Sequence, residues 1–306
     1  MNECGRLAGR SLKARNADGR ADARMQHYFT VDVEEYFQVS ALEPYVPRER
    51  WGMLESRVRG AVERLLVALD GHRARATFFF LSWIAERDRQ LVGEVVRGGH
   101  EIASHGTDHT RVTRLDPAAF RESVRRSKRT LEDLSGVEVL GYRAPSYSIV
   151  PGREWALEIL VEEGYRYDSS LFPIRRPDYG YPGTRREPHA IQTPAGPLHE
   201  FPPATLRIAG LNVPAAGGGY FRQMPYGLTR LALRQAEKRG IPGMFYIHPW
   251  ELDPHQPRLP VPWLTRIRHY RGLGRVAERL ERLLSEFRFG RVRDSLEETR
   301  GVIRET

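Results

Sequence analysis

The chain contains 306 residues, and 40% of them are hydrophobic, which is enough for one large domain or two small ones with a sizeable core. Its single cysteine, Cys4, excludes an internal disulfide and favours a reducing compartment, so we expect a cytoplasmic protein. The formal net charge of +9 would suit a polyanionic partner, but the arginines alternate with glutamates in stretches such as RVAERLERLL, as on solvated helix faces, and we expect no nucleic-acid partner.

Residues 1–26 are predicted to form a disordered basic tail. They contain no apolar stretch of the roughly 7 residues that the core of a signal peptide needs. Met25 directly precedes the first strand-like run and is a candidate for the true start of the protein. No later segment has the roughly 18 uninterrupted apolar residues of a membrane span, so we expect no transmembrane segment, while peripheral contact with a membrane stays open.

Short apolar runs alternate with stretches of helical periodicity from residue 28 onward. Gly71 is a typical helix stop, and Asp116 followed by Pro117 is a typical helix start. Strands are predicted over 28–33, 76–82, 100–105, 139–145, 165–172 and 243–250, and helices over 53–71, 83–99, 153–164, 226–240 and from Asp116 onward. Repeated strand-then-helix units predict an α/β fold with a parallel sheet, either open or closed into a barrel.

The amino-acid composition changes between residues 173 and 225, where proline, glycine and short β-like segments dominate. These segments are HAIQTP, LHEFPPATLRI and GGGYFR. We interpret the region as a β-rich insertion or lid of hairpins. A last helix and a strand-like FRFGRVRDS then close the folded part of the chain.

Polar residues lie at the ends of five predicted strands. In a parallel α/β sheet, the reactive residues gather at the carboxyl ends of the strands. The candidates are Asp32 and Glu34, His105 and His109, Arg143, Asp168, and His248. Their coincidence at five separate strand ends is the main indication of an active site.

The run FTVDVEEYF places three carboxylates in what otherwise reads as a buried strand. Side chains alternate with period two, so Asp32 and Glu34 share one face while Glu35 points to the other, toward a structural partner or solvent. One acid of the pair could bind a metal while the other takes a proton from the attacking water.

The motif HGTDH places His105 and His109 four residues apart. This spacing can direct both imidazoles at one ion, and a carboxylate from a neighbouring strand would complete a three-ligand site with an open position. By itself the spacing is weak, because two loop histidines beside a turn residue, Asp108, match it equally well.

Two further motifs suit proton transfer. Arg143, just before a rigid Ala-Pro step, could hold a catalytic carboxylate charged and oriented. His248 follows an apolar strand and suits protonation of a leaving amine near neutral pH. The nearby aromatic residues, among them Tyr147, Tyr246 and Trp250, suit either sugar stacking or the core.

In this order, the motifs resemble those of the polysaccharide deacetylases of the NodB-homology type, carbohydrate esterase family 4. The segments FTVDVEEYFQVSA, GYRAPSYSI, YRYDSSLFP, GGGYFR and FYIHPWELDP are more narrowly similar to the subgroup found at exosortase and exopolysaccharide loci, related to Helicobacter-type peptidoglycan deacetylases. The resemblance implies a distorted seven-stranded (β/α) barrel, a catalytic domain over 27–290 that includes the insertion over 173–225, and a C-terminal segment over 291–306. It also implies a divalent metal, usually zinc, and removal of N-acetyl groups from the amino sugars of a saccharide substrate.

The same resemblance assigns roles to individual residues. Asp32 would be the general base, Arg143 would position it, and His248 would be the general acid, with Asp168 a candidate for tuning His248. The metal ligands would be Glu34, His105 and His109. Substrate contacts would come from Ser146, Tyr147 and Trp250. A backbone N–H just after Pro145 would help to hold the oxyanion.

Some choices stay open at the level of sequence. A valine separates Asp32 from Glu34 where many family members have adjacent aspartates, so the roles of base and ligand could be exchanged. Hydrolysis of another amide, such as a cyclic ureide, and a catalytically silent glycan-binding protein are the alternative functions. The absence of an apparent secretion signal favours action inside the cell, at the inner face of the membrane on a lipid-linked precursor. Homo-oligomer formation is also left open.

Overall fold

A computed structural model describes residues 25–296 of the chain. Its central sheet runs in the order β10-β1-β2-β3-β4-β5-β7-β6, and every neighbouring pair up to β7 is parallel. The seven parallel strands are β1 (Gln26–Val33), β2 (Thr77–Phe80), β3 (Glu101–Ser104), β4 (Gly141–Tyr142), β5 (Tyr167–Asp168), β7 (Gly196–Glu200) and β10 (Met244–Ile247). The predicted distorted seven-stranded (β/α) barrel is confirmed.

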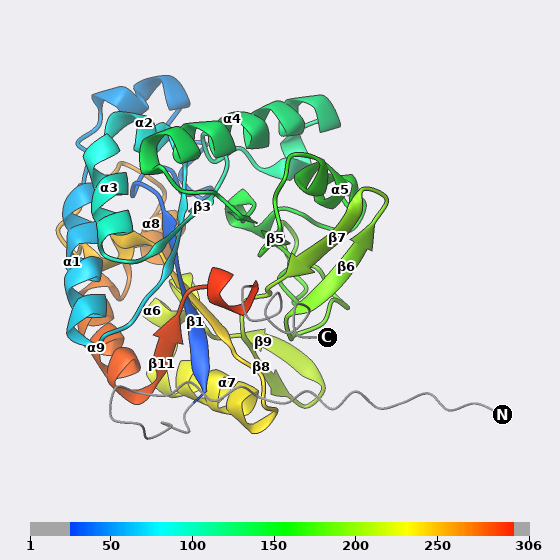
Figure 1. Cartoon of the computed structure of the whole chain (residues 1–306). Helices are drawn as coiled ribbons and strands as arrows, with labels where there is room; N and C mark the ends of the chain where they lie inside the picture. The colour runs from blue at the N-terminus through cyan, green and yellow to red at the C-terminus, as the bar shows by residue number, and fades with distance from the viewer. Residues whose placement is uncertain (1–24, 297–306) are drawn as a thin grey trace.

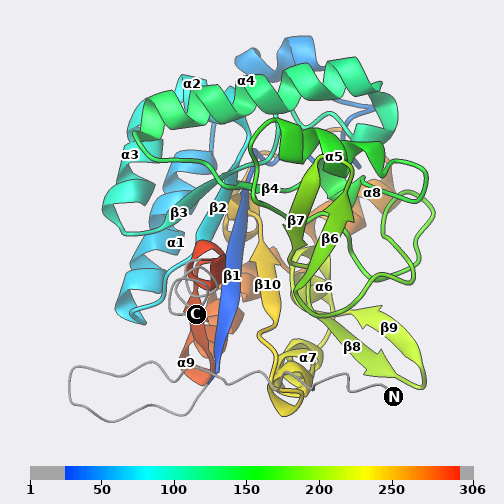
Figure 2. The same cartoon turned by 45° about the vertical axis from the view of Figure 1, so that its right-hand side comes forward.

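Helices surround the outside of this sheet, as Figures 1 and 2 show. The helices α1, α3 and α9 lie along one side, α4 and α5 cover another, and α7 lies at the opposite end from α4. Their bounds are α1 Val58–Gly71, α2 Ser82–Arg87, α3 Arg89–Arg97, α4 Pro117–Ser135, α5 Trp155–Glu162, α6 Gly218–Gln223, α7 Tyr226–Lys238, α8 Trp263–Tyr270 and α9 Val276–Glu286. Strand β11 (Arg288–Gly290) pairs in parallel with the start of β1.

Two predicted elements differ from the structure. The helix expected over 83–99 is two helices, because the side chain of Asp88 accepts a hydrogen bond from the backbone N–H of Leu91 (3.1 Å) and starts α3 as a new N-cap. The β-like GGGYFR is wrong as a strand, since most of it forms α6. Two of its glycines are required by close packing, because a Cβ atom would lie 2.3 Å from the carbonyl oxygen of Tyr246 at Gly217 and 2.7 Å from the Tyr246 ring at Gly218.

The region 173–225 contains two hairpins. Strand β6 (His189–Thr193) pairs antiparallel with β7 and extends the main sheet, whereas β8 (Thr205–Ile208) and β9 (Leu211–Pro214) form a separate two-stranded sheet. Both hairpins are visible at the right of Figure 2.

The predicted terminal segments fall partly outside the described residues. Residues 1–24 of the basic tail and 297–306 of the C-terminal segment are not described, and Gln26 already belongs to β1. The described start of the C-terminal segment is packed: Val292 is buried, and its backbone N–H donates to the hydroxyl of Thr77 (2.9 Å).

Alternation along β1 divides its side chains between two environments. Phe29, Val31 and Val33 join the large core between the sheet and the helices, whereas Tyr28 joins the cluster inside the barrel. Asp32 is on the same face as Tyr28, so its carboxylate belongs to the barrel interior. The remaining interior apolar residues are Phe79, Ala103, Leu140, Tyr167, Phe201, Met244 and Val292.

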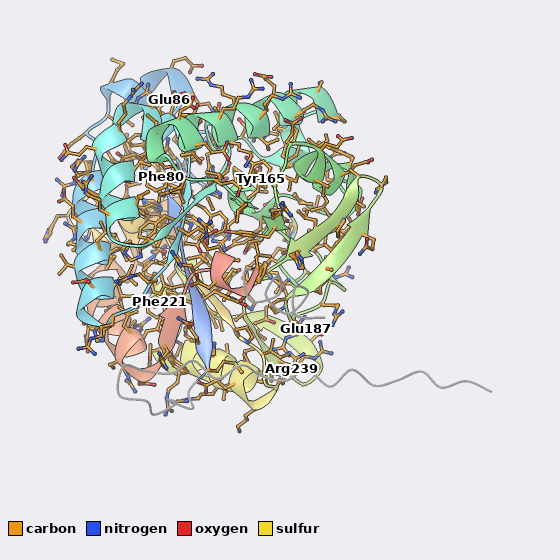
Figure 3. All side chains as sticks on the ribbon, viewed as in Figure 1. Phe80, Glu86, Tyr165, Glu187, Phe221 and Arg239 are labelled. Carbon is orange, nitrogen blue, oxygen red and sulfur yellow. The ribbon has the colours of Figure 1, made fainter. Side chains whose placement is uncertain are left out.

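The distribution of side chains is that of an ordinary globular protein (Figure 3). Phe80 and Phe221 are buried, while Glu86 and Arg239 lie on the exterior. Within residues 25–296, no helix combines the length and apolar character that crossing a bilayer requires.

Candidate metal-dependent active site

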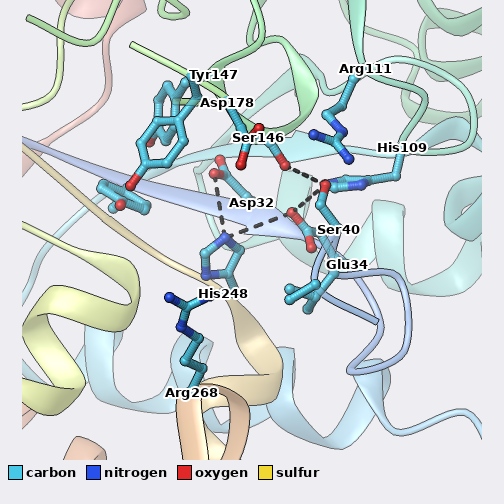
Figure 4. A pocket seen from close by; sticks show the side chains of 14 residues that line it. Asp32, Glu34, Ser40, His109, Arg111, Ser146, Tyr147, Asp178, His248 and Arg268 are labelled. Carbon is cyan, nitrogen blue, oxygen red and sulfur yellow. Dashed lines mark hydrogen bonds and ion pairs between the residues drawn. The ribbon is translucent and has the colours of Figure 1, made fainter. Parts of the chain in front are cut away.

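The predicted site residues converge at the carboxyl end of the barrel. Asp32 is the penultimate residue of β1 and Glu34 follows that strand, while His105, Arg143 and His248 each directly follow their own strand. The structure therefore brings together residues that are up to 216 positions apart in the chain (Figure 4). Parallel strands make this possible, because all of their carboxyl ends lie at the same edge.

Glu34 is at the centre of a three-residue donor set. Its Oε1 atom lies 3.3 Å from Nε2 of His105 and 3.2 Å from Nε2 of His109. All three side chains are buried, and one donor atom from each lies within 4.8 Å of the others. Burial alone would raise the pKa of Glu34, but His109, His248 and His105 together hold that pKa well below its usual range.

The orientation of His105 suits a metal ligand. Its Nδ1 lies 2.8 Å from the carbonyl oxygen of Arg143 and donates to it, so Nε2 is the nitrogen that faces Glu34 and that would bind an ion there. His109 reaches the same point from a loop in which Gly106 (φ 80°) and His109 itself (φ 60°) are left-handed. Two imidazole nitrogens and one carboxylate with an open fourth position form a donor set typical of catalytic zinc, so these residues fit such an ion.

Arg143 fixes Asp32. Its Nη1 atom donates to Oδ1 of Asp32 at 2.5 Å, and the exposed fractions of the two side chains are 0% and 3%. The same guanidinium donates to the hydroxyls of Thr30 (3.0 Å) and Ser169 (2.9 Å), and it lies over the ring of Phe79. Asp32 is thereby locked in place by a fully buried cation, with Oδ2 on the side of His248.

His248 lies on the other side of the acidic pair. Its Nε2 atom is 3.7 Å from Oε1 of Glu34 and 3.9 Å from Oδ2 of Asp32, while Nδ1 is 3.0 Å from Oε2 of Glu251. Burial lowers the pKa of His248, but Glu34, Glu251 and Asp32 outweigh it and raise that pKa to about 9. Glu251 is held in turn by Nε of Arg222 (3.1 Å).

Glu251 was missed at the level of sequence. It lies three residues after His248 in HPWEL, where its side chain also accepts from the backbone N–H of His248 (3.2 Å), as in a capping box. That spacing is the local signal that could have identified it. Asp168, the sequence-based candidate for this role, does not contact His248 among the described interactions. It accepts hydrogen bonds from the hydroxyl (2.6 Å) and N–H (3.0 Å) of Ser170, next to buried Glu200.

A pocket of about 360 Å³ opens above these residues. Ser146 and Tyr147 line it, in left-handed conformations with φ of 55° and 53°, and the hydroxyl of Ser146 contacts that of Ser40 (2.6 Å). The other lining residues are Asp32, Glu34, Val39, Ala41, His109, Arg111, Asp178, Tyr179, Tyr246, His248 and Arg268.

Trp250 does not line this pocket, which corrects its prediction as a substrate contact. Only 4% of Trp250 is exposed, because the short helix after β10 (Pro249–Leu252) turns it inward. Its ring stacks on that of His248 (centroids 5.5 Å apart) and, more closely, on that of His269 (4.5 Å). Trp250 therefore packs against the His248 ring on the side away from the pocket.

Glu35 faces away from the site, as alternation predicts. Its carboxylate accepts from the backbone N–H of Arg57 (3.0 Å) and from the hydroxyl of Ser56 (2.5 Å), just before α1. It also accepts a longer bond from the N–H of Val58 (3.4 Å). Glu35 is thus the acceptor for the unsatisfied N–H groups at the start of that helix.

Comparison with known families divides the chain in two. Residues 53–167 match the family model described as polysaccharide deacetylase, and residues 169–297 match a domain of unknown function, DUF3473. The first match includes His105, His109 and Arg143, while His248 lies in the second.

Curated relatives are similar over part of the chain. A peptidoglycan deacetylase-like protein of Gibberella zeae is 33% identical over 39% of this chain and 35% of its own length. The peptidoglycan deacetylase of Helicobacter pylori is 26% identical over 36% of each chain. The aligned part thus spans about a third of the length of these relatives.

Solved structures are similar over most of the chain. One from Mycobacterium smegmatis, named as a polysaccharide deacetylase, has a TM-score of 0.54 at 23% identity and covers 84% of this chain and 90% of that one. The PuuE allantoinase has a TM-score of 0.53 at 20% identity, with 87% of each chain covered. At these identities the likeness establishes the fold.

Proposed function

We propose that the chain, whose residues 53–167 match the polysaccharide deacetylase family, is a metal-dependent hydrolase that removes N-acetyl groups from amino sugars. The observation that carries the proposal is the convergence of Asp32, Glu34, His105, His109 and His248 at one end of the barrel, with the ion-pair distances around Glu34 all below 4 Å.

We assign Glu34, His105 and His109 as the residues that hold the metal. A divalent ion such as zinc would supply Lewis acidity there, polarising the acetamide carbonyl and lowering the pKa of a coordinated water. The geometry favours Glu34 over Asp32 as the ligand, because Glu34 lies within 3.3 Å of both imidazoles whereas Oδ1 of Asp32 is occupied by Arg143.

Asp32 then acts as the general base. Arg143 occupies one carboxylate oxygen and leaves Oδ2 directed toward the pocket, where it can accept a proton from the attacking water. The surrounding hydrogen bonds of Arg143 keep this geometry fixed before substrate arrives, so little reorganisation accompanies the reaction.

His248 acts as the general acid. The hydrogen bond of Nδ1 with Glu251 leaves Nε2 as the atom that faces the pocket, and this atom donates its proton to the amine nitrogen as the carbon–nitrogen bond breaks. Acetate and a free amino sugar are the products.

Metal binding and acetate release test the proposal separately. We expect about one zinc ion per chain by titration of the metal-free protein, with uptake lost in His105→Ala and His109→Ala and kept in the control His189→Ala, which removes a histidine on β6. Protein that takes up no zinc near neutral pH would overturn the assignment of the ligands.

Asp32→Asn tests the base. Acetate release from N-acetylglucosamine oligomers should fall by about 10²-fold or more while zinc binding persists. Undiminished release would exclude Asp32 as the base. If the wild type binds zinc but releases acetate from no N-acetylated saccharide, the deacetylase assignment fails, and allantoin in the same assay tests the cyclic ureide alternative.

A further inference from the structure

Helix α8 exposes an apolar stripe beside the pocket. Trp263, Leu264 and Ile267 have exposed fractions of 72%, 49% and 42%. Their spacing of one and four residues places them on one side of the helix. The opposite side packs against the protein, since His269 is buried there. The exposed side therefore serves no packing purpose within the part of the chain that the structure describes.

The segment that contains this stripe is rich in arginine. The segment 254–277 contains five arginines and no aspartate or glutamate: Arg258, Arg266, Arg268, Arg271 and Arg275. Among residues 25–296, none of the five has a carboxylate partner in an ion pair. This differs from α4, where Arg125 pairs with Glu163 at 2.7 Å and Arg121 pairs with Glu162 and Glu163. Within the described residues, ion pairs thus do not neutralise this segment, although Arg268 faces the pocket that Asp32, Glu34 and Asp178 also line.

We infer that this surface, the α8 face formed by Trp263, Leu264, Ile267 and the arginines around them, docks on the headgroup region of an anionic membrane. Tryptophan and aliphatic side chains with flanking arginines are the composition by which helices lie in a bilayer interface. An acidic lipid surface complements a segment rich in arginines that form no ion pair within the described residues. A membrane would also cover the apolar stripe, whereas a polyanion such as RNA would leave it exposed to water.

The same helix contributes Arg268 to the pocket lining. Figure 4 shows this side chain beside His248. Docking through α8 would therefore hold the pocket at the membrane surface. On the proposed function, this favours an N-acetylated saccharide carried on a lipid as the substrate. The docking itself requires neither metal nor turnover.

Vesicle sedimentation tests the docking directly. The full chain should bind vesicles of phosphatidylcholine with about 30% phosphatidylglycerol far better than phosphatidylcholine alone. Trp263→Ser/Leu264→Ser/Ile267→Ser should weaken binding at least tenfold. Arg266→Gln/Arg271→Gln should weaken it about 25-fold, from about a factor of 5 for each arginine. The matched control Val67→Ser/Leu231→Ser changes exposed apolar residues on α1 and α7 and should bind as the wild type does.

Spectroscopy gives a second readout that does not depend on affinity alone. Trp263 is the most exposed tryptophan, so anionic vesicles should shift the emission of the wild type to the blue and leave Trp263→Phe largely unchanged. Three results would overturn the inference: no binding of the wild type to anionic vesicles, unchanged binding of the triple variant, or self-association through α8 in place of vesicle binding. Each leaves the metal and acetate assays unaffected, so failure of the docking and failure of the proposed function are distinguishable.

Discussion

The ion pair between Asp32 and Arg143 should be energetically coupled far more strongly than any surface pair. Arg143 is wholly buried and Asp32 nearly so, with 2.5 Å between Nη1 and Oδ1. Removing one partner of a buried pair leaves an uncompensated charge and costs about 3–5 kcal/mol. Arg143→Met should therefore lower the free energy of unfolding by about 4 kcal/mol. Asp32→Asn should cost less, because Arg143 keeps its hydrogen bonds to Thr30 and Ser169.

A double-mutant cycle isolates the coupling. Asp32→Asn/Arg143→Met removes both charges, so it should be more stable than the sum of the single changes implies, by about 2 kcal/mol. Urea unfolding measures all four proteins, with EDTA present because metal at Glu34 would stabilise the folded state by an amount that differs among the variants.

The exposed pair Arg230 and Glu286 provides the matched control, at 2.7 Å and with exposed fractions of 52% and 21%. The coupling free energy from the double-mutant cycle of this pair should be less than about 1 kcal/mol. If the effects of Asp32→Asn and Arg143→Met add within about 0.5 kcal/mol, Arg143 does not hold the charge of Asp32, and its assignment as the residue that positions the base loses its support.

Three further predictions concern other buried groups. Glu251→Gln should lower kcat about 100-fold with zinc stoichiometry unchanged, because it loosens the hold on His248; unchanged kcat in acetate-release kinetics would show that Glu251 has only a structural role. Glu35→Leu should lower the free energy of unfolding by about 3 kcal/mol, because the N–H groups at the start of α1 lose their acceptor. Urea unfolding measures this change, and Glu35→Gln, which keeps one acceptor oxygen, should cost less. Burial lowers the pKa of both His27 and His100 to about 4, and Nδ1 of each ring accepts a backbone N–H, so both are neutral in the folded state. Stability should therefore be complete above pH 6.5 and fall, by about 3 kcal/mol for each ring, as the pH decreases from 6.5 to 4; a flat profile in unfolding experiments over this range would contradict the reasoning.

Local patterns were sufficient for most of the fold. The N-cap at Asp116 with Pro117 in the first turn, and the end of α1 at Gly71, appear where the sequence indicates them. The break in the helix over 83–99 has a local cause, the N-cap at Asp88, whereas the failure at GGGYFR does not. Gly217 serves a close approach to Tyr246, a contact between segments that no local pattern contains.

In the candidate site, too, local sequence patterns predict some features and not others. Alternation along β1 separates Asp32 and Glu34 from Glu35, and the structure places Glu35 at the start of α1, away from the histidines. The side chains that complete the pocket, such as Asp178 and Arg268, come from a loop and a helix with no motif of their own.

The sequence by itself determined the parallel α/β organisation and the strand ends at which the candidate site residues lie, because periodicity and capping are properties of neighbouring residues. Only the tertiary structure decided that Asp168 lies opposite Glu200 of β7, that Trp250 packs between His248 and His269, and that Arg268 of α8 completes the pocket. These choices depend on which segments meet in the folded protein, and that is set by packing between residues far apart in the chain.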